Sequence, residues 1–305
     1  MFGRMRRLGP VLLLAACHHG ALPAAGRPLD DRAWRQALET WKRERAQSIA
    51  GPDGWLTLVS LGWIDEGDNI VGAAASAKVR LPADRAPAQL GTLTLAADRV
   101  HARLGPGVTR EGTAFTEGDL LDDRDGRDPT VLEHGSLTMR VIKRGARFAL
   151  RVKDREHPAR STFPGLTYYP ADPALRFHAH LVAAPAGKTL PIVNVLGQTE
   201  AMPSPGTLHF SVAGTPYTLD AVIEPGEQQL FVLFRDTTAG HGTYPSGRFL
   251  YTSAPDAAGN VTLDFNRAYN PPCAFTPYAT CPLPPPQNRL PIAIAAGEQY
   301  AGHTE

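Results

Sequence analysis

The sequence predicts a mainly β protein made of antiparallel sandwich or barrel sheets, with one amino-terminal amphipathic helix and a long proline-rich loop near the carboxy terminus. Three observations predict this fold class. Helical periodicity is confined to the residues before Gly51, and the residues that follow form short β-branched or alternating runs separated by Gly, Pro, Asn and Asp. Residues 263–298 contain too much proline for a strand or a helix.

The helix is predicted over residues 30–49, where Asp30 or Asp31 can cap its first turn. Its apolar positions recur at helical spacing and place one face toward a core; they are Trp34, Leu38, Trp41, the stem of Arg45, and Ile49. The turn residues 51–54 end the helix. We interpret the two tryptophans as core anchors and not as ligand contacts.

The strands are predicted from runs of four to eight residues bounded by turn residues. They lie near residues 56–63, 78–81, 91–96, 100–104, 137–143, 147–152, 178–183, 188–193, 207–212, 215–219, 229–233, 248–252 and 261–265. Strands that follow one another without intervening helices favour antiparallel pairing.

The amino terminus is typical of a secreted protein. Residues 1–7 hold three arginines and no acid, residues 8–16 are apolar, and this run is too short for a membrane span of about 20 residues. Residues 14–17, Leu-Ala-Ala-Cys, resemble a bacterial lipobox. We therefore expect residues 1–16 to be a signal peptide and Cys17 to be lipidated; the alternative is an ordinary signal peptide cut near Ala24.

The lipobox also predicts where the protein resides. The resemblance implies acylation with palmitate-like chains, and His18 in place of an aspartate favours the outer membrane, with the protein facing the periplasm of the cell envelope. Residues 17–28 are predicted to form the lipidated tether. We expect a helix-plus-β subdomain over 29–153 and a second β subdomain over 154–305, although the proline-rich stretch at 154–173 can also be a crossover within one domain.

Charge argues against a nucleic-acid partner. Three of the 31 basic residues lie in the signal segment, which leaves 28 against 30 acidic residues in the mature chain. A chain without a basic surplus has little electrostatic attraction for phosphate backbones. The expected partners are the membrane, through the lipid, and a small molecule or glycan.

The unusual part of the chain is the signature loop, residues 263–298, where aromatic, polar and proline residues alternate. Together with residues 234–238, 243–244 and 247–250, and with Gly54-Trp55-Leu56 and residues 150–154 earlier in the chain, it resembles the bacterial and archaeal domain-of-unknown-function family 1684. The resemblance extends from about Trp34 to Glu298. It implies a shared fold and site but no activity.

The charged and amide side chains of this region form the candidate site. The carboxylates that can act as acid or base are Asp236, Asp264 and Glu298. The groups that can hold a polar or anionic ligand are Arg248, Asn266, Arg267, Tyr269, Asn270, Asn288 and Arg289. The alternative is a buried network that ties the loop to the sheet, because buried polar groups need partners in either case.

The remaining cysteines, Cys273 and Cys281, can form a disulfide in an oxidising compartment. A zinc site is not expected, because there is no CxxC pair and no histidine within the loop. We expect no cofactor: the sequence has no P-loop and no dinucleotide fingerprint. Residues 62–104 faintly resemble a forkhead-associated sandwich but lack its Arg and Ser-x-x-His pattern, so phosphothreonine binding is not supported.

Three functions are compatible with these observations. The first is a lipoprotein that binds a polar small molecule or an envelope glycan in a pocket under residues 264–298. The second is a hydrolase that uses a carboxylate of the same pocket. The third is a structural or assembly partner without a pocket. A close carboxylate pair in an open cleft favours the enzyme, whereas inward-facing arginines without such a pair favour binding.

Overall fold

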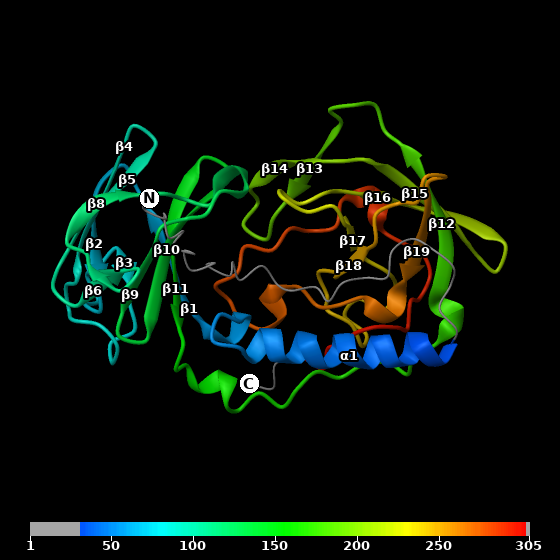
Figure 1. The fold of residues 1–305 in the computed structure, drawn as a ribbon, viewed down its shortest axis with the longest axis horizontal. Coiled ribbons are helices and arrows are strands. Elements are labelled where there is room, and N and C mark those ends of the chain that lie inside the picture. The colour runs from blue at the N-terminus through cyan, green and yellow to red at the C-terminus, as the bar shows by residue number, and fades with distance from the viewer. Residues whose placement is uncertain (1–30, 303–305) are drawn as a thin grey trace, which may run out of the picture.

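The computed structural model describes residues 31–302 of the chain, which fold into two β-rich lobes beside one long helix (Figure 1). The sheets are open and, with one exception, antiparallel, so the mainly β prediction is confirmed. The predicted signal peptide, Cys17, the tether and Asp30 lie outside the described residues. Within residues 31–302 no helix is both long and apolar enough to cross a membrane.

The amino-terminal lobe consists of two sheets around one core. The first has the order β1-β11-β10-β9-β6-β7, with bounds Leu58–Ile64, Arg147–Asp154, Leu137–Arg144, Val131–His134, Val108–Arg110 and Thr113–Ala114. The second has the order β3-β2-β4-β5-β8, with bounds Val79–Arg80, Gly67–Gly72, Gly91–Ala96, Arg99–Leu104 and Glu117–Leu120. Val79, Leu93, Leu137 and Met139 are among the buried side chains that join the two sheets, as expected where aliphatic residues alternate along facing strands.

The carboxy-terminal lobe contains a four-stranded sheet and two hairpins. The sheet has the order β16-β15-β12-β19, with bounds Thr215–Ala221, Gly206–Val212, Arg176–Ala183 and Asn260–Asp264. The hairpins are β13–β14, Thr189–Val193 and Thr199–Pro203, and β17–β18, Leu230–Phe234 and Arg248–Thr252. All ten residues of β17 and β18 are buried. This explains why β17 is a continuous apolar run, whereas in β18 three apolar residues lie between Arg248 and Thr252.

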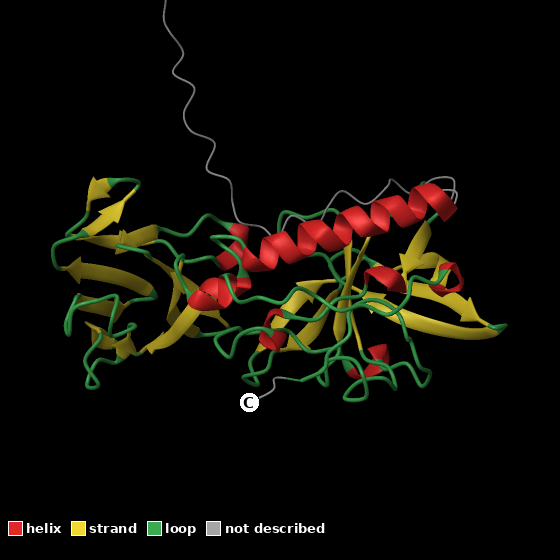
Figure 2. Cartoon of the chain, turned by 90° about the horizontal axis from the view of Figure 1, so that it is seen from below, coloured by secondary structure: helices red, strands yellow, loops and turns green. Residues whose placement is uncertain are grey.

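The helix α1, Asp31–Ala50, packs along the carboxy-terminal lobe (Figures 1 and 2). Its buried face is the predicted one. Trp34, Leu38 and Trp41 share a core with side chains of β13, β17 and β18. The expected 29–153 subdomain therefore differs from the structure: the helix belongs by packing to the later lobe, because its two tryptophans find their apolar partners there.

Two segments connect the lobes. The 3-10 turn η1, Trp55–Thr57, leads from α1 into β1. The proline-rich stretch after β11 returns to β12 through η3, Pro158–Arg160, and η4, Pro173–Leu175, and bonds to Ala50 through the Arg160 Nε at 2.9 Å. This stretch is thus a crossover that runs beside the helix. The further helical segments of residues 31–302 are also three-residue turns: η2 Arg124–Gly126, η5 Phe265–Arg267, η6 Pro272–Ala274 and η7 Pro286–Asn288.

Every strand predicted from the sequence overlaps a strand of the structure, and the ranges 91–96 and 248–252 match β4 and β18 residue for residue. The prediction omits β2, β6, β7, β8, β9 and β14. These strands are short or rich in glycine and charge, so their sequences carry little period-two signal. Their place in a sheet is set by pairing with longer neighbours and not by their own propensity.

Candidate functional site

The signature loop is ordered. The predicted site residues in and around it are held in separate networks of ion pairs and hydrogen bonds. The first joins Arg248 to Asp236 by an ion pair of 2.6 Å between side chains that are each 1% exposed. Arg248 also donates to the carbonyl oxygens of Ile294, at 2.8 Å, and Ala296. Burial lowers the pKa of Arg248, and the nearby Asp236 carboxylate partly offsets this. The pair ties the end of the loop to the β17–β18 hairpin.

The second network surrounds Asp264. This carboxylate accepts hydrogen bonds from the indole of Trp34 at 2.7 Å and from the Asn266 amide at 2.9 Å. The Arg267 Nε lies 4.0 Å from Asp264, and the guanidinium lies 5.8 Å from the ring of Trp41. Burial lowers the pKa of Arg267. These contacts hold α1 on the carboxy-terminal lobe. None of these side chains borders either of the two hollows described below.

The third network binds Glu298, which is fully buried. It forms an ion pair with Arg45 and accepts a 2.8 Å hydrogen bond from the backbone of Asn270. Arg45 in turn donates to the Asn270 carbonyl at 2.8 Å and lies 4.2 Å above the ring of Tyr269. Burial alone lowers the pKa of Arg45, but the attraction of Glu298 outweighs it and raises the pKa.

Asn288 is also buried and bonds to the backbone of Asp220 and Leu233, whereas Arg289 is exposed. The predicted carboxylates and arginines of the loop therefore do not line one hollow. Their partners are each other and the backbone, as in the alternative interpretation of the sequence. Of the candidate residues, Tyr269 and Cys281 alone border the large cleft described next.

This interlobe cleft has a volume of about 730 Å³. The amino-terminal lobe contributes strands β10 and β11 and the turn η2; the carboxy-terminal lobe contributes the β13–β14 hairpin, residues 224–227, aromatic side chains of β17 and β18, and residues 279–282 of the signature loop. The two lobes touch where Gly126 of the amino-terminal lobe meets Pro225 of the carboxy-terminal lobe. The approach is so close that a Cβ atom on Gly126 would lie 2.9 Å from the Cβ of Pro225.

Arg151 of β11 is the unusual side chain of the interlobe cleft. It is 7% exposed, and among the described residues no carboxylate pairs with it. Its one hydrogen bond runs from Nη2 to the hydroxyl of Thr280 at 3.4 Å, and its Nε has no partner. Burial, and then the cations Arg144 and Arg140, lower its pKa to about 9, although the attraction of the Asp123 carboxylate acts in the opposite direction. The protein thus keeps a cation in a place that disfavours its charge.

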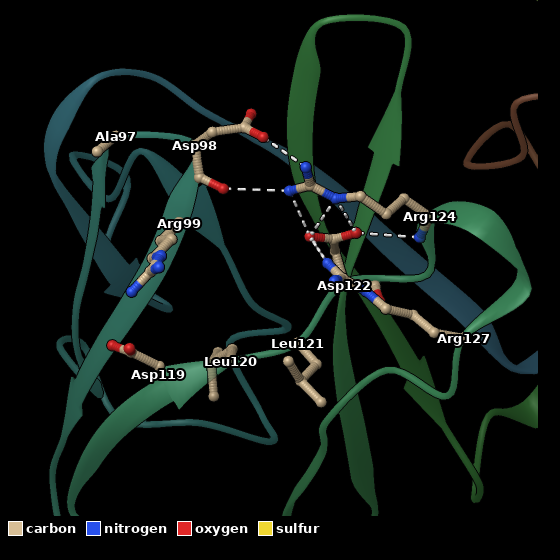
Figure 3. A pocket seen from close by; sticks show the side chains of 9 residues that line it. All are labelled: Ala97, Asp98, Arg99, Asp119, Leu120, Leu121, Asp122, Arg124 and Arg127. Carbon is tan, nitrogen blue, oxygen red and sulfur yellow. Dashed lines mark hydrogen bonds and ion pairs between the residues drawn. The ribbon is translucent and has the colours of Figure 1, made fainter.

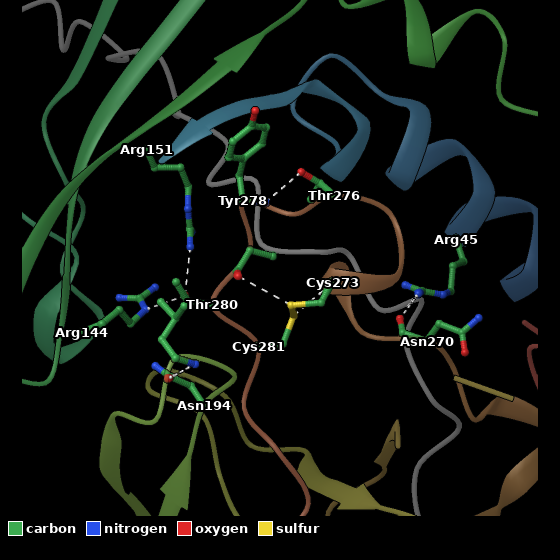
Figure 4. Close-up of a disulfide and its surroundings, with 12 residues drawn as sticks. Arg45, Arg144, Arg151, Asn194, Asn270, Cys273, Thr276, Tyr278, Thr280 and Cys281 are labelled. Atoms are coloured by element: carbon green, nitrogen blue, oxygen red, sulfur yellow. Dashed lines mark hydrogen bonds between the residues drawn. A yellow bond between two sulfur atoms is a disulfide. The ribbon is translucent and has the colours of Figure 1, made fainter. Parts of the chain in front are cut away.

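Arg144 of β10 stands beside it. Its guanidinium is paired with Asp123 at 2.9 Å, and its Nε donates to the same Thr280 hydroxyl at 3.3 Å. Figure 4 shows the two guanidinium groups converging on Thr280 from neighbouring strands. Thr280 is next to Cys281, which forms a disulfide with Cys273. The disulfide therefore holds the loop that presents Thr280 to the arginines.

The carboxy-terminal lobe gives the interlobe cleft an aromatic floor and an acidic side. The rings of Phe231 and Tyr251 stack with centroids 4.7 Å apart, and Tyr269 is stacked on Tyr251 at 6.2 Å. The Tyr251 hydroxyl donates to the carboxylate of Glu224. Burial raises the pKa of Glu224, although the hydrogen bond from Tyr251 acts in the opposite direction.

A second hollow of about 430 Å³ lies on the amino-terminal lobe (Figure 3). Four of its charged groups bond to one another: Arg124 bonds to Asp98 and to Asp122, and Arg127 bonds to Asp122. Asp119 pairs with His101 outside the hollow. In residues 31–302 no cluster of three or more His, Cys, Asp or Glu side chains can hold a metal.

Sequence reasoning missed Arg144, Arg151, Thr280 and Glu224. The sequence of β11 contains a signal for one of them, Arg151. In β11 the charged residues Arg151 and Lys153 alternate with Leu150 and Val152, and both faces of the strand are buried. A charge inside a strand with two buried faces is costly. The sequence alone does not show that the second face is covered, since that cover comes from the other lobe.

The family model described as "Protein of unknown function (DUF1684)" matches residues 161–299. The match is narrower than the expected resemblance, which began near Trp34, so it leaves out residues 150–154 and the front of the chain. No curated protein sequence matches the chain.

Three solved structures are similar to parts of the chain. An uncharacterized protein of Haloarcula marismortui, solved by NMR, is 33% identical over 46% of this chain and 78% of its own, with a TM-score of 0.39. An FHA domain from work on phosphothreonine-dependent interactions is 18% identical over 32% of this chain and 96% of its own, with a TM-score of 0.22. An FhaA FHA domain is 17% identical over 31% and 98%, also with a TM-score of 0.22. None of these three superpositions supports an inference about the ligand.

Proposed function

We propose that this chain, whose residues 161–299 match the DUF1684 family model, binds a small organic anion in the interlobe cleft. The single observation that supports this proposal is the environment of the Arg151 side chain. Its guanidinium is buried, borders the interlobe cleft and has no carboxylate partner among the described residues.

The physical reason is the cost of an unpaired charge. Arginine keeps its proton in proteins, and a buried cation without a counter-ion costs several kcal/mol relative to water. A carboxylate or phosphate in the interlobe cleft would supply the missing counter-ion and the acceptor for the Arg151 Nε. Arginine binds such groups with two parallel hydrogen bonds. Arg144 and the hydroxyl of Thr280 stand close enough to share the same anion.

The hydrolase alternative has less support. Its expected carboxylates, Asp236, Asp264 and Glu298, are each occupied by a cation or by hydrogen-bond donors, and none borders the interlobe cleft. A general acid or base has to reach the substrate proton directly or through one water. The assembly-partner alternative is disfavoured by the size of the interlobe cleft.

A thermal-shift series tests the proposed function. The probes are inorganic phosphate, phenyl phosphate, benzylammonium and maltose, and the proteins are the wild type, Arg151→Met and, as a matched control, Arg289→Met, which removes an exposed arginine outside the cleft. We expect phenyl phosphate to raise the melting temperature of the wild type and the control but not of Arg151→Met. Stabilisation by maltose or benzylammonium alone, or an equal shift in Arg151→Met, would overturn the proposal.

We also propose that the protein acts at the cell envelope, anchored by the lipid on Cys17. The support is the lipobox of residues 14–17. Labelled palmitate should enter the wild type and not Cys17→Ser. Incorporation of the label into Cys17→Ser contradicts the anchor and leaves the ligand proposal unaffected.

A further inference from the structure

The part of the interlobe cleft contributed by the carboxy-terminal lobe is acidic. Glu200 of β14, and Glu224 and Glu227 of the loop after β16, all border it. No described residue forms an ion pair with any of the three. Apart from Arg151, the cations that line the interlobe cleft have other partners, since Arg45 pairs with Glu298, Lys143 with Asp98, Arg144 with Asp123, and Arg124 with Asp98 and Asp122. The cleft therefore contains unpaired charge of both signs.

Glu224 is the best placed of these acids. It is half-buried, it accepts a hydrogen bond from the Tyr251 hydroxyl, and Tyr251 belongs to the aromatic floor. The repulsion of Glu227 and Glu200 adds to the burial that raises its pKa. A negative charge on Glu224 therefore has no cationic partner among the described residues, as the positive charge on Arg151 has no anionic one.

We propose that Glu224 is a second subsite of the interlobe cleft, which binds an ammonium group of the same ligand. This proposal rests on the proposed function, because it assumes that the anionic end of the ligand is held by Arg151. The ligand class it names is a dipolar organic molecule, with a carboxylate or phosphate at one end, an amine at the other and an apolar or aromatic part between them.

The geometry supports this class in two ways. Arg151 and Glu224 come from different lobes, and each is held by its own neighbours, Thr280 and Tyr251, so they do not neutralise each other. One dipolar molecule can neutralise both. The floor between the lobes is built of packed rings, Phe231, Tyr251 and Tyr269, which offer apolar surface and π-faces to the middle of such a ligand and to its ammonium group.

Isothermal titration calorimetry with two matched probes tests the subsite. The probes are phenyl phosphate and 4-(aminomethyl)phenyl phosphate, which differ by one aminomethyl group. The proteins are the wild type, Glu224→Gln and Glu66→Gln, an exposed control outside the cleft. Glutamine keeps an acceptor for the Tyr251 hydroxyl, so Glu224→Gln should remain folded.

We expect the aminomethyl group to tighten binding about 10-fold in the wild type and in Glu66→Gln. In Glu224→Gln this gain should fall below about 3-fold, while the affinity for phenyl phosphate stays within about 3-fold of the wild type. An equal gain in Glu224→Gln, or no gain in the wild type, overturns the second subsite and leaves the anion site intact. If neither probe binds the wild type, the proposed function itself is wrong.

Discussion

Arg45 of α1 forms a buried ion pair with Glu298, which lies 253 residues further along the chain. The same carboxylate accepts the backbone N–H of Asn270, and the same guanidinium reaches the Asn270 carbonyl. One pair thus joins the helix, the first part of the signature loop and its end. Since Arg45 and Tyr269 also border the interlobe cleft, the pair fixes part of the cleft wall.

Removing one partner of this pair should be strongly destabilising. Glu298→Gln leaves the Arg45 charge buried without a counter-ion, which typically costs about 3–5 kcal/mol. The free energy of unfolding from urea denaturation measures this. The double variant Arg45→Met/Glu298→Met serves as a control and should recover much of the loss, because apolar replacement removes both charges. A loss below about 1 kcal/mol in Glu298→Gln contradicts the structural role.

Arg151→Met should behave in the opposite way. Because Arg151 has no carboxylate partner, its replacement by a residue of similar length removes an uncompensated charge and gives up one long hydrogen bond. We expect the unliganded variant to be as stable as the wild type or more stable. Calorimetric melting checks this, with Arg248→Met as the contrasting variant, because Arg248 is paired with Asp236. Marked destabilisation of Arg151→Met would show that the side chain has a structural purpose.

Loss of the disulfide should affect both stability and binding. Closing a loop between residues eight apart contributes about 2–3 kcal/mol in the chain-entropy model. The double variant Cys273→Ser/Cys281→Ser should lose about that much and should bind phenyl phosphate more weakly, because Thr280 is no longer fixed. Thr280→Val, which keeps the disulfide, separates the two effects. Unchanged binding in both variants contradicts the role of this loop in the anion site.

The turn after β8 should give a pH-dependent contribution to stability. Burial pushes the pKa of Asp122 upward, but hydrogen bonds from Arg124 outweigh it and lower the pKa to about 2 from 3.8. A depressed carboxylate pKa stabilises the fold above the unfolded pKa, and this contribution disappears as the pH falls from about 4 toward 2. Asp122→Asn should therefore cost about 1–2 kcal/mol at pH 7, and the difference should shrink as the pH falls below about 4 and be lost below about pH 2. A difference that does not change with pH contradicts this assignment.

The sequence predicted the elements well where one face of an element is buried. The helix face of Trp34, Leu38, Trp41 and Ile49 agrees with the structure, because a 3.6-residue period is visible in a single sequence. That the signature loop is ordered could also be predicted, because its aromatic residues can pack against the rest of the protein. Which lobe the helix packs against could not be predicted, because this depends on which apolar surface the strands leave uncovered.

The site was harder to predict than the fold. The sequence singles out the charged residues Asp236, Arg248 and Glu298. In the structure each of them forms an ion pair with another residue of the protein. Arg151 is informative for the opposite reason: no carboxylate among the described residues pairs with it, and its one hydrogen bond runs to Thr280. Whether a charge is paired is a property of three-dimensional neighbours, and Thr280 lies 129 positions from Arg151. No pattern of spacing along one chain reports such a relationship.

The most direct test of the central claim is the dissociation constant of phenyl phosphate, measured by calorimetry on the wild type and on Arg151→Met at the same ionic strength. A buried charge that lacks its anion should account for about 2–5 kcal/mol of binding. We predict that Arg151→Met binds at least about 30-fold more weakly than the wild type while retaining its melting temperature. Equal affinities of the two proteins, or no binding by the wild type, would contradict an anion site at Arg151.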